Sequence, residues 1–308
     1  MTDFQIEPLS SSLFNQAKQF VEANEKYSVS LSAMISAVKV PVPTAPQGNI
    51  FCIFKIENGI KTLEGVFGIT NGELILHNVP FLFEDSPLQA APEKFKELRT
   101  KLLAEITPIV KAHNIFSIMG EASSSDFFCE ATGKEPACRR AYILMEYKPN
   151  TAETNFARFS PKSLLQQGLF MRECQTSDAE ALYPLQKEYD IVEVLPPNTE
   201  HNEFACKMSL KRNLAHHLIY AVFYGNQPVA KAGTNAMGTF YYQIGGVFTE
   251  KKWRNKHLAR AAVGIVVKAS LAKGKKVVLF VKTENEPAKA SYRHAGFVPC
   301  SNYEIYYF

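Results

Sequence analysis

Residues 241–260 constrain the fold more than any other segment, because a predicted strand runs there directly into a basic helix start. The strand YYQIGGVFT (241–249) is followed by EKKWRNKHLAR (250–260) and then by an apolar helical stretch. Gly245 and Gly246 weaken a strand, so we expect them where a bulge opens the sheet or a ligand approaches the backbone closely. This junction is the first place to look for a site.

The predicted helix start is suited to an anion. The first turn of a helix has N–H groups without partners inside the helix and carries roughly half a positive charge from the helix dipole, so it can hold a pyrophosphate without side chains. Five basic side chains surround this turn: Lys251, Lys252, Arg254, Lys256 and Arg260. Taken alone, such a cluster is more often a solvated loop than a site. As a site, it suits a ligand with three phosphates.

The second half of the chain predicts an ordered series of strands and helices. Expected strands are LFMREC (169–174), HLIYAVFY (217–224), VAKAGTNAM (229–237), YYQIGGVFT (241–249), VVLFV (277–281) and VPCSNYEIYYF (298–308). Helices are expected at 176–194, where Asp178 is a candidate cap, and at 203–214, 258–273 and 287–294. The order is strand, helix, helix, three strands, helix, strand, helix, strand.

The first half repeats this order with weaker signals. Strands are predicted at 50–56, 63–70, 73–79, 115–120 and 142–147, a long helix at 93–112 and a short one at 124–131. Between the halves, the segment around residues 148–167 contains Pro149 and Pro161 and no sustained period, which is typical of a linker. We therefore expect a first domain at 1–149, a linker at 150–168 and a second domain at 169–308.

Two motifs in the second half resemble the GNAT superfamily of N-acetyltransferases. RNKHLA (254–259) is similar to its Arg/Gln-x-x-Gly-x-Gly/Ala pyrophosphate loop, with His257 where the family usually has glycine; histidine tolerates a positive φ better than most residues. VLFVKTENEPAKASYRHAGF (278–297) resembles the pattern that ends such domains. Its matching residues are Asn285, Ala288, Tyr292, Gly296 and Phe297. The resemblance covers about residues 170–308.

The resemblance implies a site for acetyl-coenzyme A (acetyl-CoA) and a reaction. The backbone of Val247, Phe248 and Thr249 would pair with the pantetheine arm, and Asn285 would lie beside it. The pyrophosphate would be held by Arg254, Asn255, Lys256, His257, Leu258, Ala259 and Arg260. Tyr292 is then the candidate general acid for the departing thiolate. The strand 241–249 contains no carboxylate, so a water chain or Glu193 is the candidate base.

The implied fold is α/β (α+β), with two GNAT-like domains, each a mixed, mostly antiparallel central sheet flanked by helices. The segment PFLFEDSPLQAAPE (80–93) has three prolines, two acidic residues before its last glutamate, and neither glycine nor arginine. A pyrophosphate would meet negative charge and fewer amide donors there. We therefore expect the tandem arrangement in which only the carboxy-terminal domain binds acetyl-CoA, one site per chain. The silent domain would shape the acceptor cleft or form an interface, and a homodimer is left open.

Alternatives follow from the remaining features. A non-catalytic acyl-CoA sensor or interaction module would keep the loop without turnover. Nucleic-acid binding is disfavoured, because the net charge is only +4 and Trp253 is the one aromatic residue among the basic side chains.

Six cysteines without CxxC pairing argue against a metal and for a reducing compartment. Without a long apolar segment, we expect a cytoplasmic protein without membrane contact. The amine acceptor stays open between small molecules and protein amines.

Overall fold

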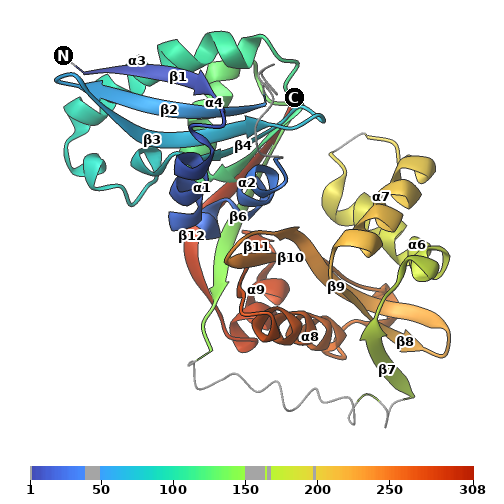
Figure 1. Cartoon of the computed structure of the whole chain (residues 1–308). Coiled ribbons are helices and arrows are strands. Elements are labelled where there is room, and N and C mark those ends of the chain that lie inside the picture. The colour runs from blue at the N-terminus through green and yellow to red at the C-terminus, as the bar shows by residue number, and fades with distance from the viewer. Residues whose placement is uncertain (1, 39–48, 150–163, 165–167, 197–198) are drawn as a thin grey trace. The chain divides into compact units, whose positions relative to one another are not determined.

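The computed structural model describes residues 2–38, 49–149, 164, 168–196 and 199–308. The chain divides into two compact units: unit 1 comprises Met1–Ile143 with Ser301–Phe308, and unit 2 comprises Leu144–Cys300. Figure 1 shows the strands and helices of both. The linker predicted at 150–168 lies outside the described residues except for Leu164 and Gly168.

Unit 1 is a mixed sheet with helices on both faces. Its elements are β1 (Thr2–Pro8), α1 (Phe14–Ala23), α2 (Val29–Ser36), β2 (Ile50–Glu57), β3 (Ile60–Ile69), β4 (Leu74–Asn78), α3 (Pro92–Lys111), β5 (Ser117–Glu121), α4 (Ala122–Thr132), the first part of β6 (Cys138–Tyr147) and the last part of β12 (Phe297–Tyr307). The strands follow the order β1-β2-β3-β4-β5-β12. Of these pairs, β4–β5 is parallel and the others are antiparallel.

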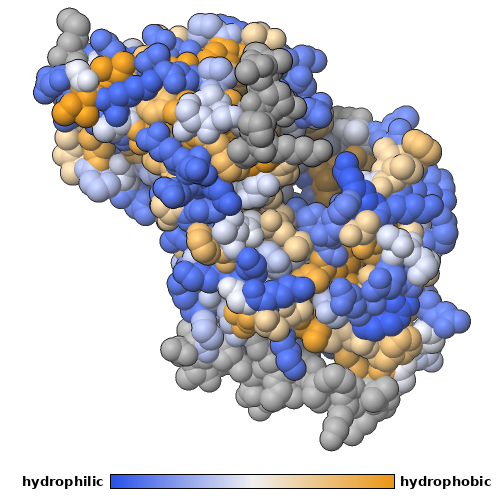
Figure 2. Space-filling view, in the orientation of Figure 1, coloured by the Kyte–Doolittle hydropathy of each residue, from blue (hydrophilic) through white to orange (hydrophobic). Residues whose placement is uncertain are grey.

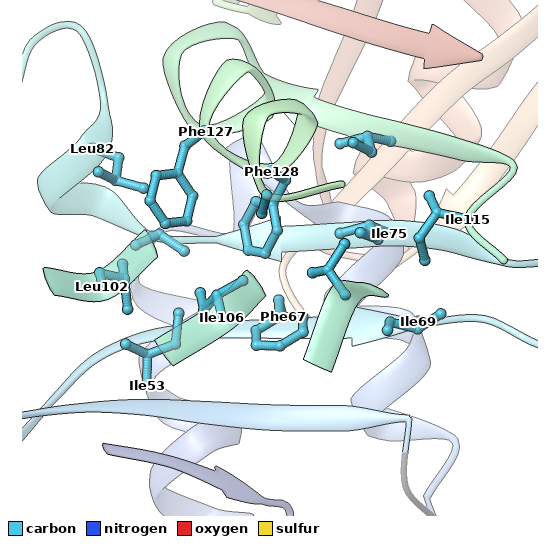
Figure 3. Packing of buried hydrophobic residues seen from close by; sticks show 14 of the residues in the cluster. Ile53, Phe67, Ile69, Ile75, Leu82, Leu102, Ile106, Ile115, Phe127 and Phe128 are labelled. Carbon is cyan, nitrogen blue, oxygen red and sulfur yellow. The ribbon is translucent and has the colours of Figure 1, made fainter. Parts of the chain in front are cut away.

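Alternating side chains of these strands fill two cores. Phe67 of β3 packs with Leu102 and Phe128 under α3 and α4 (Figure 3), whereas its neighbour Val66 packs with Leu31 on the face of α1 and α2. Successive strand residues point to opposite faces, so a strand that is apolar throughout can serve both cores. The Phe67 and Phe128 rings lie 5.3 Å apart between centroids.

Unit 2 has the predicted element order. After β7 (Leu169–Glu173) come α6 (Ala179–Tyr189), a π-helical turn (Asp190–Val194), α7 (Glu203–His216), β8 (Ile219–Tyr224), β9 (Gln227–Met237), β10 (Tyr241–Thr249), α8 (Leu258–Ala272), β11 (Lys276–Lys282), α9 (Glu286–His294) and the start of β12. The sheet order is β6-β11-β10-β9-β8-β7. Ala221 faces the core under α6 and α7, and its neighbour Val222 faces the core that contains Leu258 of α8.

Asp178 does not cap α6 as predicted. It ends a short 3₁₀ turn, where its carboxylate accepts a hydrogen bond from the Gln175 N–H at 2.7 Å and pairs with Arg172 at 2.7 Å; α6 itself has no side-chain cap. The Gln175 N–H and Arg172 therefore bind the carboxylate in place of the first N–H groups of α6. An aspartate near a turn can accept from the preceding backbone as readily as from a helix start.

The surface and the described helices give two further observations. On the face seen in Figure 2, hydrophilic and hydrophobic residues are interspersed over both units. In the described part of the chain, no helix combines the length and apolar character that a membrane crossing requires. The same residues contain no group of three or more His, Cys, Asp or Glu side chains arranged to hold a metal ion.

Candidate functional site

The site begins where β10 separates from β11. The two strands pair in parallel from Tyr241 opposite Lys276 to Ile244 opposite Leu279, although β10 continues to Thr249 and β11 to Lys282. On its other side, β10 shifts register against β9 between Gly245 and Phe248, with one more residue on β10 than on β9. Gly246 has φ 61°, a left-handed conformation that glycine adopts without strain. The glycine pair thus marks a bulge at the point of divergence.

The turn before α8 presents backbone donors. Asn255 and His257 both have positive φ, 62° and 59° respectively, and α8 starts at Leu258 without a side-chain cap. Residues in such left-handed conformations turn successive N–H groups toward one side, and the first helical N–H groups have no acceptor within the helix. His257 therefore adopts the conformation for which glycine would be the usual residue, and the loop retains its tight turn.

Two basic side chains of the loop are held against aromatic rings. The Arg254 Nε donates to the Thr249 carbonyl at 3.2 Å, and its guanidinium lies 5.6 Å from the Phe248 ring centroid. The Lys256 ammonium lies 4.4 Å from the centroid of Trp253. Both are exposed, so their charges can meet an anion at the α8 start.

Two buried polar atoms beside this loop have no hydrogen-bond partner among the described residues: the Thr249 Oγ1 and the Trp253 Nε1. Buried polar atoms are nearly always satisfied in folded proteins, so each such atom asks for an explanation. Both lie at the end of β10 or just after it, next to the loop. A polar ligand at this junction can satisfy them, which makes the residues present compatible with a phosphate-bearing coenzyme.

Tyr292 lies on α9 in a half-buried position, 6.2 Å from the Phe297 ring centroid. Burial raises the pKa of its phenol well above its usual range, and Tyr189 and Glu193 lie close enough to raise that pKa further. The phenol is therefore protonated at neutral pH and can donate a proton. The structure brings the two predicted catalytic side chains, Tyr292 and Glu193, into one neighbourhood.

Glu193 is held in an ion pair. It lies in the π-helical turn that follows α6, and its Oε2 is 2.8 Å from the Nζ of Lys282 at the end of β11. Single π-helical turns occur frequently at functional sites. A carboxylate at this place is the group that could accept a proton from a substrate amine.

Asn285 acts as a helix cap. It precedes α9, and its Oδ1 accepts a hydrogen bond from the Ala288 N–H at 3.1 Å. Asparagine is among the residues preferred at this position, because its side-chain oxygen can accept a hydrogen bond from an N–H group of the first helical turn. The cap uses the amide oxygen, so the Nδ2 of the same side chain is a separate donor.

Lys231 was missed by the sequence analysis. It lies on β9 opposite Phe248 of β10, its side chain is 4% exposed, and its Nζ donates to the Gly246 carbonyl at 2.9 Å. The signal was present, since VAKAGTNAM places a lysine between alanines in an otherwise buried strand. Its contact with the bulge could not be read from one strand alone.

Unit 1 has the same junction with different chemistry. The parallel pairing of β4 with β5 ends at Leu76 opposite Met119, and α3 begins at Pro92 with acidic Glu93 in its first turn. Beyond the last pair, the buried His77 ring lies so close to Gly120 that a Cβ there would be 2.2 Å from it. The imidazole bonds to the Ser125 Oγ at 2.9 Å. The His77 side chain therefore occupies the space next to Gly120, just beyond the last pair of β4 and β5.

Comparisons with known proteins agree with this geometry. Residues 179–297 match the family model described as the acetyltransferase (GNAT) family. A GNAT-family acetyltransferase from Colwellia psychrerythraea is similar over 99% of each chain, with a TM-score of 0.52 and 13% identity. A tandem GNAT protein of the clavulanic acid biosynthesis pathway has a TM-score of 0.50 and 12% identity, covering 99% of this chain and 98% of that one.

A Drosophila protein matches over 98% of each chain with a TM-score of 0.59 and 11% identity. No curated protein matches the sequence. At such identities the solved structures show the fold, and they show it over nearly the whole chain. They confirm the predicted fold class of two similar α/β units.

Proposed function

We propose that the protein transfers an acetyl group from acetyl-CoA to a primary amine, because residues 179–297 match the acetyltransferase (GNAT) family model and the chain has the fold of a tandem GNAT protein. The observation that carries the proposal is the divergence of β10 from β11 at a bulge that leads into the donor-rich start of α8. This arrangement offers a backbone edge and an anion site side by side, which a pantetheine arm with its pyrophosphate requires.

In this proposal the loop and the first turn of α8 bind the pyrophosphate. The N–H groups of residues 255–260 supply the donors, and Arg254 and Lys256 supply mobile positive charge. The backbone of residues 247–249 pairs with the pantetheine arm as an added strand, and Asn285 lies beside that arm. Acetyl-CoA supplies the activated acetyl thioester.

For the transfer, the substrate amine attacks the thioester carbonyl directly. N–H groups of the bulged strand donate to the carbonyl oxygen as negative charge develops on it. The protonated phenol of Tyr292 gives its proton to the thiolate as coenzyme A leaves. Glu193, which is paired with Lys282, accepts a proton from the amine directly or through water. The six free cysteines suit a reducing compartment, so a cytoplasmic location belongs to the same proposal.

Calorimetric titration tests the binding part. We expect acetyl-CoA to bind wild-type protein with one site per chain, and the double variant Arg254→Ala, Lys256→Ala to bind at least about 10-fold more weakly, because two charges next to the phosphates are lost. The matched control is Lys268→Ala, Lys273→Ala, which removes the same charge from the other end of α8 and should bind as wild type. An equal loss of affinity for acetyl-CoA in both double variants would mean that binding depends on the net charge of the protein and not on Arg254 and Lys256.

Release of free thiol during incubation with amine panels tests the transfer. Small amines and peptides with free amino groups should be screened with wild type and with Tyr292→Phe. An amine that wild type acetylates and Tyr292→Phe does not would support the proposal. Tight binding of acetyl-CoA without turnover of any amine would instead favour a non-catalytic acyl-CoA sensor.

A further inference from the structure

Lys231 is a lysine inside the core of unit 2. Its side chain is only 4% exposed, and it lies in the middle of β9 between Ala230 and Ala232. Burying an ammonium group is unfavourable unless specific partners compensate for the lost water. The side chain therefore needs an explanation beyond filling space, since an apolar residue of similar volume would do that without the desolvation penalty.

Its contacts are concentrated on the bulge of β10. The Nζ donates to the Gly246 carbonyl at 2.9 Å and lies 4.5 Å from the ring centroid of Tyr189. A Cβ on Gly246 would be 3.1 Å from the same Nζ, and the φ of that residue is 61°. The lysine and the glycine thus fit one another, and together they define the shape of the bulge.

The groups that face the ammonium leave it charged at neutral pH. Burial lowers the pKa of Lys231 to about 8, while Asp190 of the π-helical turn and the thiols of Cys174 and Cys206 oppose this shift. Tyr189 of α6 presents the face of its ring, which attracts a cation. A substantial positive charge therefore lies directly behind the bulge.

The Gly246 carbonyl shares a peptide group with the Val247 N–H. In a planar trans peptide the C=O and N–H bonds point in opposite directions, so this N–H points away from Lys231. A hydrogen bond to the carbonyl oxygen polarises the peptide group and strengthens its N–H as a donor. Because the donor to the carbonyl is an ammonium, the effect is larger than for a neutral donor.

We propose that Lys231 is a positioning residue for acyl transfer: its bond to the Gly246 carbonyl fixes the bulge and polarises the Val247 N–H, which donates a hydrogen bond to the thioester oxygen. The inference rests on the proposed function and adds a residue that acts through the backbone rather than on the substrate. Its influence grows as the carbonyl oxygen gains negative charge in the transition state, so it raises kcat more than affinity.

The test is infrared spectroscopy of acetyl-CoA labelled with ¹³C at the carbonyl and bound to the full chain. In wild type we expect the carbonyl band to move to lower frequency on binding. In Lys231→Met most of that shift should disappear, kcat should fall about 10-fold to 100-fold, and the Kd for acetyl-CoA should change less than about 3-fold. Lys231→Arg, which keeps the charge, should restore part of the shift.

A control separates this effect from the loss of any buried lysine. Lys289 lies on α9 and is 7% exposed, and its Nζ donates a hydrogen bond to the Thr283 carbonyl. Lys289→Met should leave the carbonyl band where it is in wild type. Thermal unfolding of both variants shows whether they are folded; Lys231→Met should be as stable as wild type or more stable, because a buried charge has gone.

A titration of wild type needs no variant and covers the case in which Lys231→Met does not fold. The band of bound acetyl-CoA should move back toward that of free acetyl-CoA as the pH rises through about 8. An unchanged band in Lys231→Met, or across this titration, overturns the inference. If wild type binds acetyl-CoA but acetylates no amine, the proposed function fails, and the band still decides the role of Lys231.

Discussion

Tyr292 is the residue on which the proposed chemistry depends most directly. Burial keeps its phenol protonated at neutral and mildly alkaline pH, as a general acid requires. Tyr292→Phe removes the proton and keeps the ring contact with Phe297. We expect kcat to fall about 100-fold or more, with the Kd for acetyl-CoA and the melting temperature nearly unchanged.

The matched control for that variant is Tyr303→Phe. Burial raises the phenol pKa of Tyr303 as it does that of Tyr292, but Tyr303 belongs to unit 1. This variant should keep full activity in the thiol-release assay. An active Tyr292→Phe, or an equal loss in both variants, would remove Tyr292 from the mechanism.

Lys231 predicts how stability depends on pH. The pKa of its ammonium is about 8 in the folded protein against 10.5 for an ordinary lysine, so between these values the unfolded chain holds more protons. The free energy of unfolding therefore rises with pH in this range, and the shift corresponds to about 3 kcal/mol in total. Lys231→Met lacks this contribution.

Urea unfolding at about pH 7.5 and at about pH 9.5 measures the contribution of Lys231 to the free energy of unfolding. Relative to Lys231→Met, wild type should gain about 2 kcal/mol of stability between the two conditions. Equal changes in both proteins would mean that the ammonium is not desolvated in the folded state.

At the residue scale, the sequence could indicate local geometry but not contacts. The helix cap at Asn285 and a left-handed His257 follow from residue type and position in a motif. The ion pair of Glu193 with Lys282 joins residues far apart in the chain, and so does the bond from Lys231 to Gly246. Both depend on which elements become neighbours in the sheet, and no local pattern encodes that.

Helix capping at α9 links stability to the proposed site at the scale of an element. Asn285→Ala removes the hydrogen bond to the Ala288 N–H, which should lower the free energy of unfolding by about 1 kcal/mol. If Asn285 also lies beside the pantetheine arm, the Kd for acetyl-CoA should rise about 3-fold to 10-fold, since one hydrogen bond contributes about 1 kcal/mol.

Unit 2 contains a matched cap with no expected ligand contact. The Asn202 Oδ1 accepts from the Ala205 N–H at 2.9 Å at the start of α7. Asn202→Ala should cause the same loss of stability and leave acetyl-CoA binding unchanged. Chemical unfolding and calorimetry on both variants compare them, and an equal change of Kd would assign the effect at Asn285 to loosening of the domain.

Elements were predicted well where periodicity and breakers agreed. Helix α8 was expected at 258–273 and spans Leu258–Ala272, because an apolar stripe ends there at Gly274. The glycine pair in β10 correctly indicated an irregular strand. The helices α1 and α2 and the strand β1 were not predicted, since the short amino-terminal stretch offers few strong capping or breaking signals before Pro41.

At the scale of the whole molecule, the duplicated architecture leads to unequal sites. Both units have a parallel strand pair that ends before the strands do, but in unit 1 the His77 ring lies against Gly120 just beyond the last pair, and the next helix starts at Pro92 with Glu93 in its first turn. We therefore expect titration of acetyl-CoA to saturate at one molecule per chain. Saturation at two would contradict the silent role assigned to unit 1.

The path of the last strand could not be inferred from the sequence. Residues 298–308 are predicted as one strand, yet the residues up to Cys300 belong to unit 2, while Tyr303–Tyr307 pair antiparallel with β5 in unit 1. Pairing partners of a strand depend on long-range register, and an apolar strand pattern is compatible with either sheet. The order of elements was therefore predictable, whereas the assignment of this strand to two units was not.

Substitutions at the two ends of β12 should loosen different units. Tyr306 lies in the core of unit 1 beneath α3 and α4, and Phe297 is buried in unit 2, 5.5 Å from the Tyr147 ring centroid. Changing either to alanine should lower the local free energy of unfolding by about 3–5 kcal/mol, because a buried aromatic side chain is lost.

Hydrogen exchange followed by mass spectrometry should then show faster exchange in β4 and β5 for Tyr306→Ala. For Phe297→Ala the faster exchange should lie in β11 and α9. Faster exchange over the same segments in both variants would mean that the two units unfold as one, with β12 serving a single cooperative core.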